Sequence, residues 1–468
     1  KPLLGIHSMV FDEIQTLGGK DPDFHRRDLL EAIEMGDYPE YELGVQIVDE
    51  EDEFKFDFDI LDSTKIIPEE LVPIKPIGKM VLNRVPDNFF AETEQVAFQP
   101  TNVVPGIDFS DDPLLQGRIF AYPDTQRHRL GTANFESLPI NRPVCPVNND
   151  QRDGFSQYNI YTSKVNYSPN SLGGGCPMAS PESMGAFVHY AEKLGGRKVR
   201  ERSESFSDHF SQATLFLNSM SKAEKEHLVK AAHFELGKVM NKEVKERVIG
   251  LFNHVDHEFA TLVAAGLGIE APAKEVIPNH GKSSPAVSME NQPKESIKTR
   301  KIAVIAADGV DGAQLMAVKQ ALKAEGAIPM IVSKFGGKIK GTDGKEIDVE
   351  RTFLTSASVM FDAIYIPGGE KSIATLKSDN DVSEFIYSAF KHCKAIAATG
   401  EGVDLIAAAN VKDIKLADAE KSVSDKGVIT SRNASSVKQV AQDFVKAIAQ
   451  HRHWVREEKK ETKQMIPA

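Results

Sequence analysis

Apolar and polar positions in residues 1–110 follow the short alternations of β-structure. The segment FKFDFDIL at 54–61 alternates apolar and polar residues almost strictly, as a half-buried strand does. The runs YELGVQIV at 41–48 and GKMVLNRV at 78–85 are also rich in β-favouring residues and are bounded by turn residues. A short helix is predicted for DFHRRDLLEAI at 23–33. This part of the chain is therefore predicted to be antiparallel β-sheet with helical insertions.

Helical periodicity is clearest in residues 181–267. Ser221 and Glu224 have the spacing of a capping box at a helix start. Further on, apolar residues keep helical spacing without a proline, at Val244, Val248, Leu251, Phe252, Val255, Phe259, Leu262 and Val263. Charged residues fill the opposite face, so we interpret this stripe as core packing without a chemical role.

From residue 300 the pattern changes to that of a parallel α/β domain. KIAVIAAD begins with a continuous apolar strand of the buried type, GAQLMAVKQALKAEG follows as a helix, and IPMIVS is the next strand. FDAIYIPGG and KAIAATGEG are further strands that end in glycine turns. The alternation predicts a doubly wound α/β domain over 300–468.

Two stretches without a sustained period separate these regions. Residues 132–180 are rich in Asn, Pro, Gly and Ser, and so long a loop in a folded protein wraps another surface or serves a site. Residues 268–299 carry Pro, Ser, Lys and Glu without a pattern and are predicted to be an exposed linker. The expected division of the chain is 1–131, 132–180, 181–267, 268–299 and 300–468.

Composition excludes several classes of function. The 468 residues exceed one compact core, so two or three domains are expected. A balance of 56 Lys and Arg against 68 Asp and Glu gives a net charge of -12, which argues against a general binder of nucleic acids or anionic membranes. No apolar run reaches the roughly 18 residues that span a bilayer. Three distant cysteines, Cys145, Cys176 and Cys393, argue against a disulfide framework and indicate a reducing compartment such as the cytoplasm.

The most distinctive polar pattern lies in GRIFAYPDTQRHRLG, residues 117–131. Asp111 or Asp112 followed by Pro113 is a good helix start. Residues three and four apart share one face of a helix, which predicts a single stripe formed by Arg118, Tyr122, Gln126 and Arg129. Two cations beside a phenol suit an anionic or metallic ligand.

The stripe has a specific chemical interpretation and a simpler one. A phenol ionises near pH 10, but a guanidinium one turn away together with a ferric ion favours the phenolate, and tyrosinate ligates haem iron in catalases. Arg129, two turns beyond Tyr122, could then meet a haem propionate. By spacing alone, the alternative is a surface tyrosine near two solvated arginines.

The wider sequence favours the haem interpretation. Residues 98–131, FQPTNVVPGIDFSDDPLLQGRIFAYPDTQRHRLG, closely resemble the proximal haem segment of the monofunctional haem catalases. Further segments resemble that family's β-barrel, namely DPDFHRRDLLEAI, GDYPEYELGVQI, FDFDILDSTKIIPEELVPI and GKMVLNRVPDNFFAETEQVAF, and LPINRPVCPVNNDQRDG resembles its wrapping segment. The resemblance runs from residue 1 to about 267, and the α/β domain after the linker is similar to the C-terminal domain of the catalases with large subunits.

The resemblance implies an α+β catalase fold. It consists of part of an antiparallel β-barrel, a wrapping segment and an α-helical domain, followed by a C-terminal doubly wound α/β domain of the flavodoxin-like, class I amidotransferase-like type. The implied function is haem-dependent decomposition of hydrogen peroxide to water and oxygen, which protects against oxidative stress. A cytoplasmic homotetramer without nucleic-acid or membrane partners is expected, and relatives with large subunits generally do without NADPH.

The resemblance also implies roles for residues of the stripe and its surroundings. Tyr122 would be the proximal ligand of a ferric haem and Arg118 its charge partner, with Asp112 in the polar network behind that arginine. Arg129 would pair with a propionate. The implied contacts with the porphyrin ring are Leu114, Ala121 and Gln126.

Two neighbouring positions modify this expectation. Some family members join a histidine covalently to the proximal tyrosine, but Gln99 occupies the matching position here, so an unlinked tyrosine is expected. Pro123 directly follows Tyr122 and is expected to kink the helix or weaken its bonding.

The chain departs from the family pattern at the distal side of the haem. Catalases split peroxide with a distal histidine and asparagine, and no residue here matches either motif, so both are expected upstream of Lys1 in an N-terminally truncated chain. The chain as written is expected to show little turnover, because the proton transfer between the peroxide oxygens lacks its acid–base group.

A second departure concerns the C-terminal domain. Active amidotransferase-like relatives carry a cysteine and then a histidine in a strand-to-helix turn, where this chain has Gly400 and Glu401. Gln314 stands where an acid is expected, and Cys393 is interpreted as a buried structural cysteine. The domain is therefore predicted to lack hydrolase activity and to serve assembly or substrate access.

Three functions remain open from the sequence. The leading one is the haem catalase. A non-catalytic haem-binding or assembly fragment is the second, motivated by the missing distal residues. The third is a catalase-related haem enzyme that acts on lipid hydroperoxides, which the additional C-terminal α/β domain disfavours.

Overall fold

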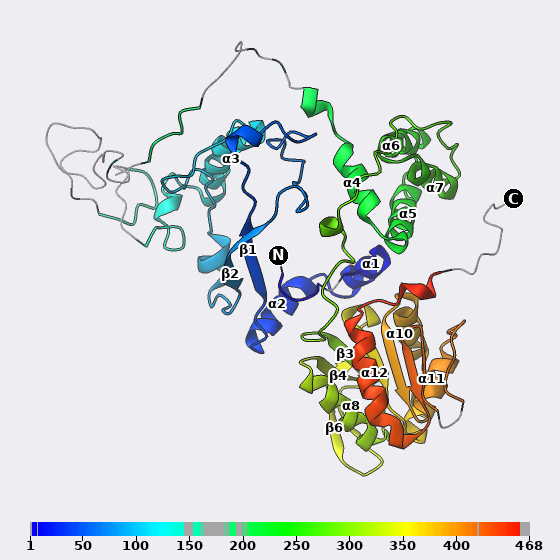
Figure 1. The fold of residues 1–468 in the computed structure, drawn as a ribbon. Coiled ribbons are helices and arrows are strands. Elements are labelled where there is room, and N and C mark those ends of the chain that lie inside the picture. The colour runs from blue at the N-terminus through cyan, green and yellow to red at the C-terminus, as the bar shows by residue number, and fades with distance from the viewer. Residues whose placement is uncertain are drawn as a thin grey trace. The chain divides into compact units, whose positions relative to one another are not determined.

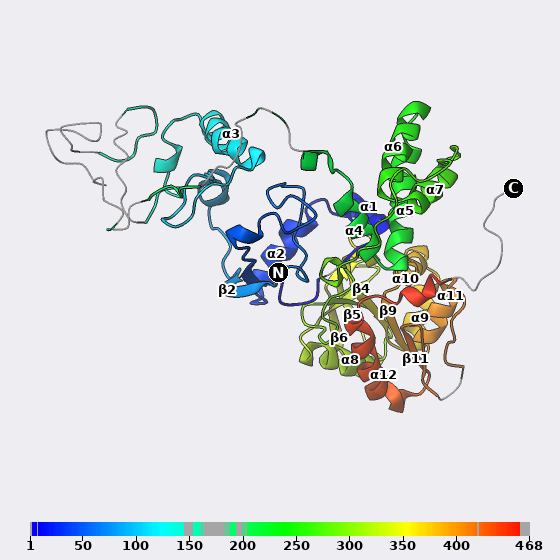
Figure 2. The same cartoon turned by 45° about the horizontal axis from the view of Figure 1, so that its top comes forward.

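The computed structural model describes most of the chain (Figures 1 and 2). The described residues are 2–6, 8–144, 153–160, 162, 183, 187–192, 199, 201, 204–418 and 421–458. They divide into two compact units. The first unit comprises Lys1–Gln46, Pro68–Asn83 and Ala213–Ala468, and the second comprises Ile47–Ile67 and Arg84–Gln212.

The N-terminal part of the first unit has two helices and one antiparallel ribbon. The helices are α1 (Phe11–Lys20) and α2 (Phe24–Glu34), and the ribbon pairs β1 (Glu40–Val45) with β2 (Lys75–Val81). They confirm the predicted helix at 23–33 and the β-structure within the runs that begin at 41 and 78. In the described part of residues 1–131 this ribbon is the only pair of named strands, so a barrel stays a prediction.

The predicted strand at 54–61 is wrong. These residues form turns and bends, and Phe54 is 91% exposed. The carboxylate of Asp59 accepts a hydrogen bond from the backbone N–H of Leu61 at 2.9 Å. An aspartate bonded to the backbone two residues on stabilises a turn, and this local bond competes with the ladder of a strand.

Four helices form a separate packed cluster in the chain. They are α4 (Ser211–Ser219), α5 (Lys222–Gly237), α6 (Lys242–Val255) and α7 (His257–Leu267). The predicted capping box is confirmed, because the Ser221 hydroxyl accepts from the N–H of Glu224 and the Glu224 carboxylate accepts from the N–H of Ser221. The cluster core is built from Leu217, Ile249, Phe259, Ala260, Val263 and Ala264.

The apolar stripe from 244 to 263 spans two helices rather than one. Asp256 has an extended backbone between α6 and α7, and its carboxylate caps α7 by accepting from the N–H of Phe259 at 2.8 Å. The resulting change of direction removes part of the stripe from the core. Leu251 and Leu262 are 53% and 49% exposed, so the prediction of core packing is wrong for these two residues.

Residues from 301 onwards confirm the doubly wound α/β prediction. Within the described residues they form a seven-stranded sheet of order β10-β11-β9-β8-β3-β4-β7, in which only β10 runs antiparallel to its neighbour. Its strands are β3 (Lys301–Ile305), β4 (Ile328–Ser333), β7 (Arg351–Thr352), β8 (Ala363–Ile366), β9 (Ala395–Thr399), β10 (Val423–Asp425) and β11 (Val428–Ser431). A small antiparallel ribbon pairs β5 (Gly337–Lys340) with β6 (Glu346–Val349).

Helices cover both faces of this sheet, as both views show (Figures 1 and 2). One face packs against α8 (Gly312–Ala324) and α12 (Val437–Ala449), and the other against α9 (Glu370–Lys377), α10 (Asn380–Lys391) and α11 (Gly402–Ala408). Alternate residues of β3 supply the two cores, with Ile302 and Val304 on one side and Ala303 and Ile305 on the other. A strand buried on both faces is apolar throughout, which is why the sequence pattern was continuous.

The predicted linker is less exposed than expected. Residues 268–299 contain one short helical turn, Pro285–Val287, but Ser284 and Ile297 are each 2% exposed. The Ser284 hydroxyl donates to the Glu70 carboxylate at 2.7 Å. The segment is therefore anchored at particular side chains.

In its described residues, the second unit is mainly irregular, with one long helix, α3 (Pro113–Leu130). It also contains single helical turns at Glu50–Asp52, Phe90–Glu94, Phe135–Ser137 and Glu204–Ser207. Much of the predicted wrapping segment lies outside the described residues, namely 145–152, 161 and 163–180, together with Cys145 and Cys176. No helix in the described part of the chain is long and apolar enough to cross a membrane.

Candidate functional site

Helix α3 presents the stripe that the sequence predicted. Asp112 is the N-cap, because its carboxylate accepts from the N–H of Leu114 at 2.9 Å, and Pro113 occupies the first turn. The helix ends at Gly131, whose positive φ of 71° suits glycine. It continues through Pro123, which lacks an N–H and so removes one helical hydrogen bond without ending the helix.

Arg118 and Tyr122 are in direct contact on this helix. The guanidinium donates a hydrogen bond from Nη2 to the phenol oxygen, and its carbon lies 5.0 Å from the ring centroid. The predicted pairing of these two side chains is therefore confirmed. Arg118 is exposed and Tyr122 is half-buried, so the phenol oxygen has a cation beside it at an accessible surface.

Gln126 and Arg129 are brought together, but they contact the backbone of a distant segment. Gln126 is the buried residue of α3, and its oxygen accepts from Nε of Arg129 at 3.1 Å. Arg129 also donates to the carbonyls of Glu94 at 2.6 Å and Val96 at 2.5 Å. No sequence signal identified these partners, because they are backbone atoms of another segment.

Apolar side chains near the stripe are exposed. Leu114 is 51% exposed and Ala121 is exposed as well, as the expected ring contacts require. Phe98 and Phe120, which the sequence analysis did not single out, are 74% and 75% exposed. Large exposed apolar side chains are typical of surfaces that bind a ligand or another protein segment.

The donor set of the stripe fits a haem better than a bare metal ion. Across the described ranges, no group of three or more His, Cys, Asp and Glu side chains is placed to hold a metal. A porphyrin supplies its own four nitrogen donors, so an iron porphyrin needs a single protein ligand such as the phenolate of Tyr122. The Gln99 amide donates to the Thr101 hydroxyl at 2.6 Å, and the unlinked tyrosine stays a prediction.

A second group of polar contacts lies at the carboxyl ends of β8 and β9. Gly400 and Glu401 form the predicted strand-to-helix turn, and Gly400 has a φ of 56°. The Glu401 carboxylate accepts from the N–H of Gly369 at 2.8 Å, and the Gln314 oxygen accepts from the N–H of Gly368 at 3.2 Å. The side chains of Gln314 and Glu401 therefore accept hydrogen bonds from the backbone N–H groups of Gly368 and Gly369.

Cys393 is a buried structural cysteine, as predicted. It is 0% exposed and follows α10 with a φ of 56°. Burial raises the pKa of its thiol to about 12, so a nucleophilic thiolate does not form near neutral pH.

Comparison with known proteins covers nearly the whole chain. Residues 1–174 match the family model of catalase, residues 203–267 that of catalase-related immune-responsive proteins, and residues 298–458 that of the C-terminal domain found in long catalases.

Named relatives show the same similarity. Catalase-2 of Bacillus subtilis (strain 168) is 49% identical over 97% of this chain and 64% of its own length. The catalase of Alkalihalophilus pseudofirmus is 50% identical over 97% of this chain and 65% of its own length. Catalase HPII of Mycobacterium avium is 48% identical over the same shares. This chain therefore spans somewhat less than two thirds of the length of these relatives.

Proposed function

Because this chain belongs to the catalase family, as a member with the C-terminal domain of long catalases, we propose that it is a haem-dependent catalase. The proposed reaction converts hydrogen peroxide to water and oxygen. The observation that carries the proposal is the Arg118–Tyr122 pair on α3, within the segment that matches the catalase family model. The relatives are named catalases, which favours this reaction over the metabolism of lipid hydroperoxides.

Tyr122 would hold the haem iron through its phenolate oxygen. Arg118 would stabilise negative charge on that oxygen, because its guanidinium already donates to it. Leu114 and Ala121 are exposed and would contact the porphyrin ring. Asp112 would support the same end of α3 as its N-cap. When bound, the ferric haem would supply the redox centre that one hydrogen peroxide oxidises and a second reduces.

Gln126 and Arg129 would contact a haem only after a change in their present hydrogen bonds. Arg129 donates to the carbonyls of Glu94 and Val96, so pairing with a propionate requires it to exchange those partners. Gln126 is buried and accepts from Arg129, so it would contact the ring only through a change of its side chain.

The finer architecture belongs to the same proposal. We infer a flavodoxin-like C-terminal domain, because its parallel strands β4-β3-β8-β9-β11 have the order 2-1-3-4-5 when numbered along the chain without the short edge strand β7. The ribbon β1–β2 would belong to the antiparallel barrel. From the family resemblance we also propose the five-part domain division, a homotetramer and a cytoplasmic location.

The haem-ligand role is tested by the variant Tyr122→Phe in the protein expressed from its complete reading frame. We expect the variant to lose most of its Soret absorbance per chain and most of its oxygen evolution from hydrogen peroxide. Tyr158→Phe is the matched control, since Tyr158 is 60% exposed and lies outside α3, and it should retain both. A normal haem spectrum in Tyr122→Phe would contradict the assignment.

A further inference from the structure

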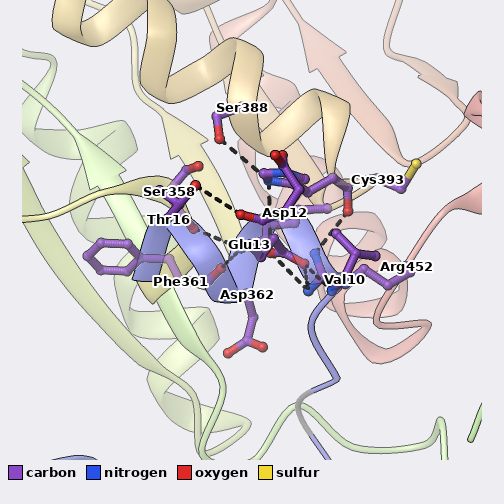
Figure 3. A network of polar contacts seen from close by, with 12 residues as sticks. Val10, Asp12, Glu13, Thr16, Ser358, Phe361, Asp362, Ser388, Cys393 and Arg452 are labelled. Carbon is purple, nitrogen blue, oxygen red and sulfur yellow. Dashed lines mark hydrogen bonds and ion pairs between the residues drawn. The ribbon is translucent and has the colours of Figure 1, made fainter. Parts of the chain in front are cut away.

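Glu13 of α1 is a carboxylate with no exposure to solvent. It lies against the C-terminal α/β domain, 381 positions away in the sequence from its partner Lys394. Its Oε1 is 2.8 Å from Nζ of Lys394, and its Oε2 is 2.9 Å from Nη2 of Arg452. Figure 3 shows Glu13 between Arg452 on one side and Ser358 and Phe361 on the other.

The adjacent Asp12 extends the same contact. Its carboxylate lies 2.8 Å from Nε2 of His392 and 2.6 Å from Nζ of Lys391. Two successive carboxylates in the first turn of α1 therefore face the end of α10 and the residues that follow it. Opposite charges line the two sides of this contact.

Each of the three N–H donors of the Lys394 ammonium group has an acceptor, and one of these acceptors is Glu13 of α1. The Lys394 side chain is 1% exposed, and its ammonium group donates to the carbonyls of Ser358 and Phe361 at 2.8 and 2.7 Å, in addition to Glu13. An ammonium group has three donors, so this set is complete. Asp362, a nearby carboxylate of the domain itself, is engaged by Arg300 at 3.1 Å and by the N–H of Lys301.

Arg452 also binds the segment that precedes α1. Besides Glu13, it donates to the carbonyl of Ser8 at 2.8 Å and to the carbonyl of His392 at 2.9 Å. The neighbouring His451 lies within hydrogen-bonding distance of the backbone and hydroxyl of Ser8. The same arginine thus joins the segment before α1 to the turn after α10.

We propose that Lys394, Arg452 and His392 form a binding site for an acidic helix on the C-terminal domain, and that α1 of the same chain is its ligand. Glu13 is the anchoring residue, because it places a carboxylate between two buried cations. Leu17, one turn further along α1, is buried as well, at 6% exposure. Another side of α1 packs on the helical cluster, where the ring centroids of Phe11 and Phe234 of α5 lie 5.5 Å apart.

The electrostatics explain why the site selects a carboxylate. Removing a cation from water is costly unless a counter-charge and hydrogen bonds replace the solvent. Burial lowers the pKa of Lys394 to about 8, while Glu13 acts in the opposite direction. Burial alone would raise the pKa of Glu13, but the charges of Lys394 and Arg452 outweigh it and hold that pKa below its ordinary value.

The test uses the full chain and the hydrogen exchange of α1 amides, with α6 amides as the internal reference. Glu13→Gln keeps the length of the side chain and one acceptor but removes the charge. We expect α1 to exchange at least about a hundredfold faster in this variant, since breaking a buried pair is strongly destabilising. Glu34→Gln is the matched control, because Glu34 is an exposed carboxylate of α2 outside this contact, and it should change α1 exchange by less than about threefold.

A double variant separates specific recognition from general packing. In a Lys394→Gln background, the same Glu13→Gln change should accelerate α1 exchange at least about tenfold less than in the wild type, because the charges are coupled. Equal acceleration in both backgrounds, or unchanged α1 exchange in Glu13→Gln, would overturn the proposal.

A milder variant covers the case in which Glu13→Gln does not fold. Arg452→Lys keeps the positive charge but loses the second donor arm, and it should accelerate α1 exchange about tenfold with α6 unaffected. If α1 exchange stays at the wild-type rate in Arg452→Lys, the proposed site is not what holds the helix.

Discussion

Replacing His453 should remove a large acid sensitivity from the C-terminal domain. Its ring packs on Gly427, where a Cβ would lie 2.1 Å from the ring, and its Nε2 lies 3.1 Å from the carbonyl of Ala447. Burial lowers the pKa of His453 to about 4, and the positive charge of Arg456 acts in the same direction. His453 is therefore neutral in the folded protein at pH values where an unfolded chain protonates it.

The magnitude follows from the difference between the two pKa values. An unfolded histidine has a pKa of about 6.5, and one pKa unit corresponds to about 1.4 kcal/mol. Because the unfolded state binds the proton first, the stability is fully present above about pH 6.5 and falls as the pH decreases. By about pH 4 the loss attributable to His453 should reach about 3 kcal/mol.

The single tryptophan of the chain provides the assay. Trp454 adjoins His453, so urea unfolding followed by its fluorescence reports on this region. We expect the free energy of unfolding of the wild type to fall more steeply between pH 7.5 and 4 than that of His453→Gln, by about 3 kcal/mol over the interval. His209→Gln, at an exposed histidine, is the control and should follow the wild type. Identical pH dependence in His453→Gln and the wild type would refute the reasoning.

Two further predictions concern Arg118 and Cys393. Arg118→Ala should weaken phenolate ligation and reduce Soret absorbance per chain, whereas Arg118→Lys should retain more of it because a cation remains; equal spectra in all three proteins would remove the proposed role. The Cys393 thiol should react with a maleimide at least about a hundredfold more slowly in the folded protein than in urea at pH 8, because burial suppresses both its thiolate and its access; a similar rate in the two states would contradict this.

The sequence predicted best those elements whose pattern is decided by local chemistry or by complete burial. The strands from 301 onwards are continuous apolar runs because helices cover both faces of the sheet. The Arg118–Tyr122 contact was also predictable, because residues four apart on a helix are neighbours. The prediction of a strand at 54–61 failed because the Asp59 carboxylate accepts a hydrogen bond within its own turn. The alternation of apolar and polar residues does not reveal this local bond.

Long-range polar contacts were beyond the sequence pattern. Arg129 donates to the carbonyls of Glu94 and Val96, and backbone acceptors leave no side-chain signal. The sequence analysis assigned no role to Glu13, because only the folded chain brings it to Lys394 and Arg452. The break at Asp256 had a local signal, an aspartate able to cap α7, but the unbroken apolar spacing hid it.

The position of the haem iron relative to Tyr122 tests the central claim most directly. Anomalous diffraction at the iron absorption edge, from crystals of the haem-loaded protein expressed from its complete reading frame, locates that iron without assuming its ligand. The proposal predicts one iron peak within bonding distance of the Tyr122 phenol oxygen, with the Arg118 guanidinium beside that oxygen. An iron peak bound to another residue, with the Tyr122 oxygen outside bonding distance, would contradict the account.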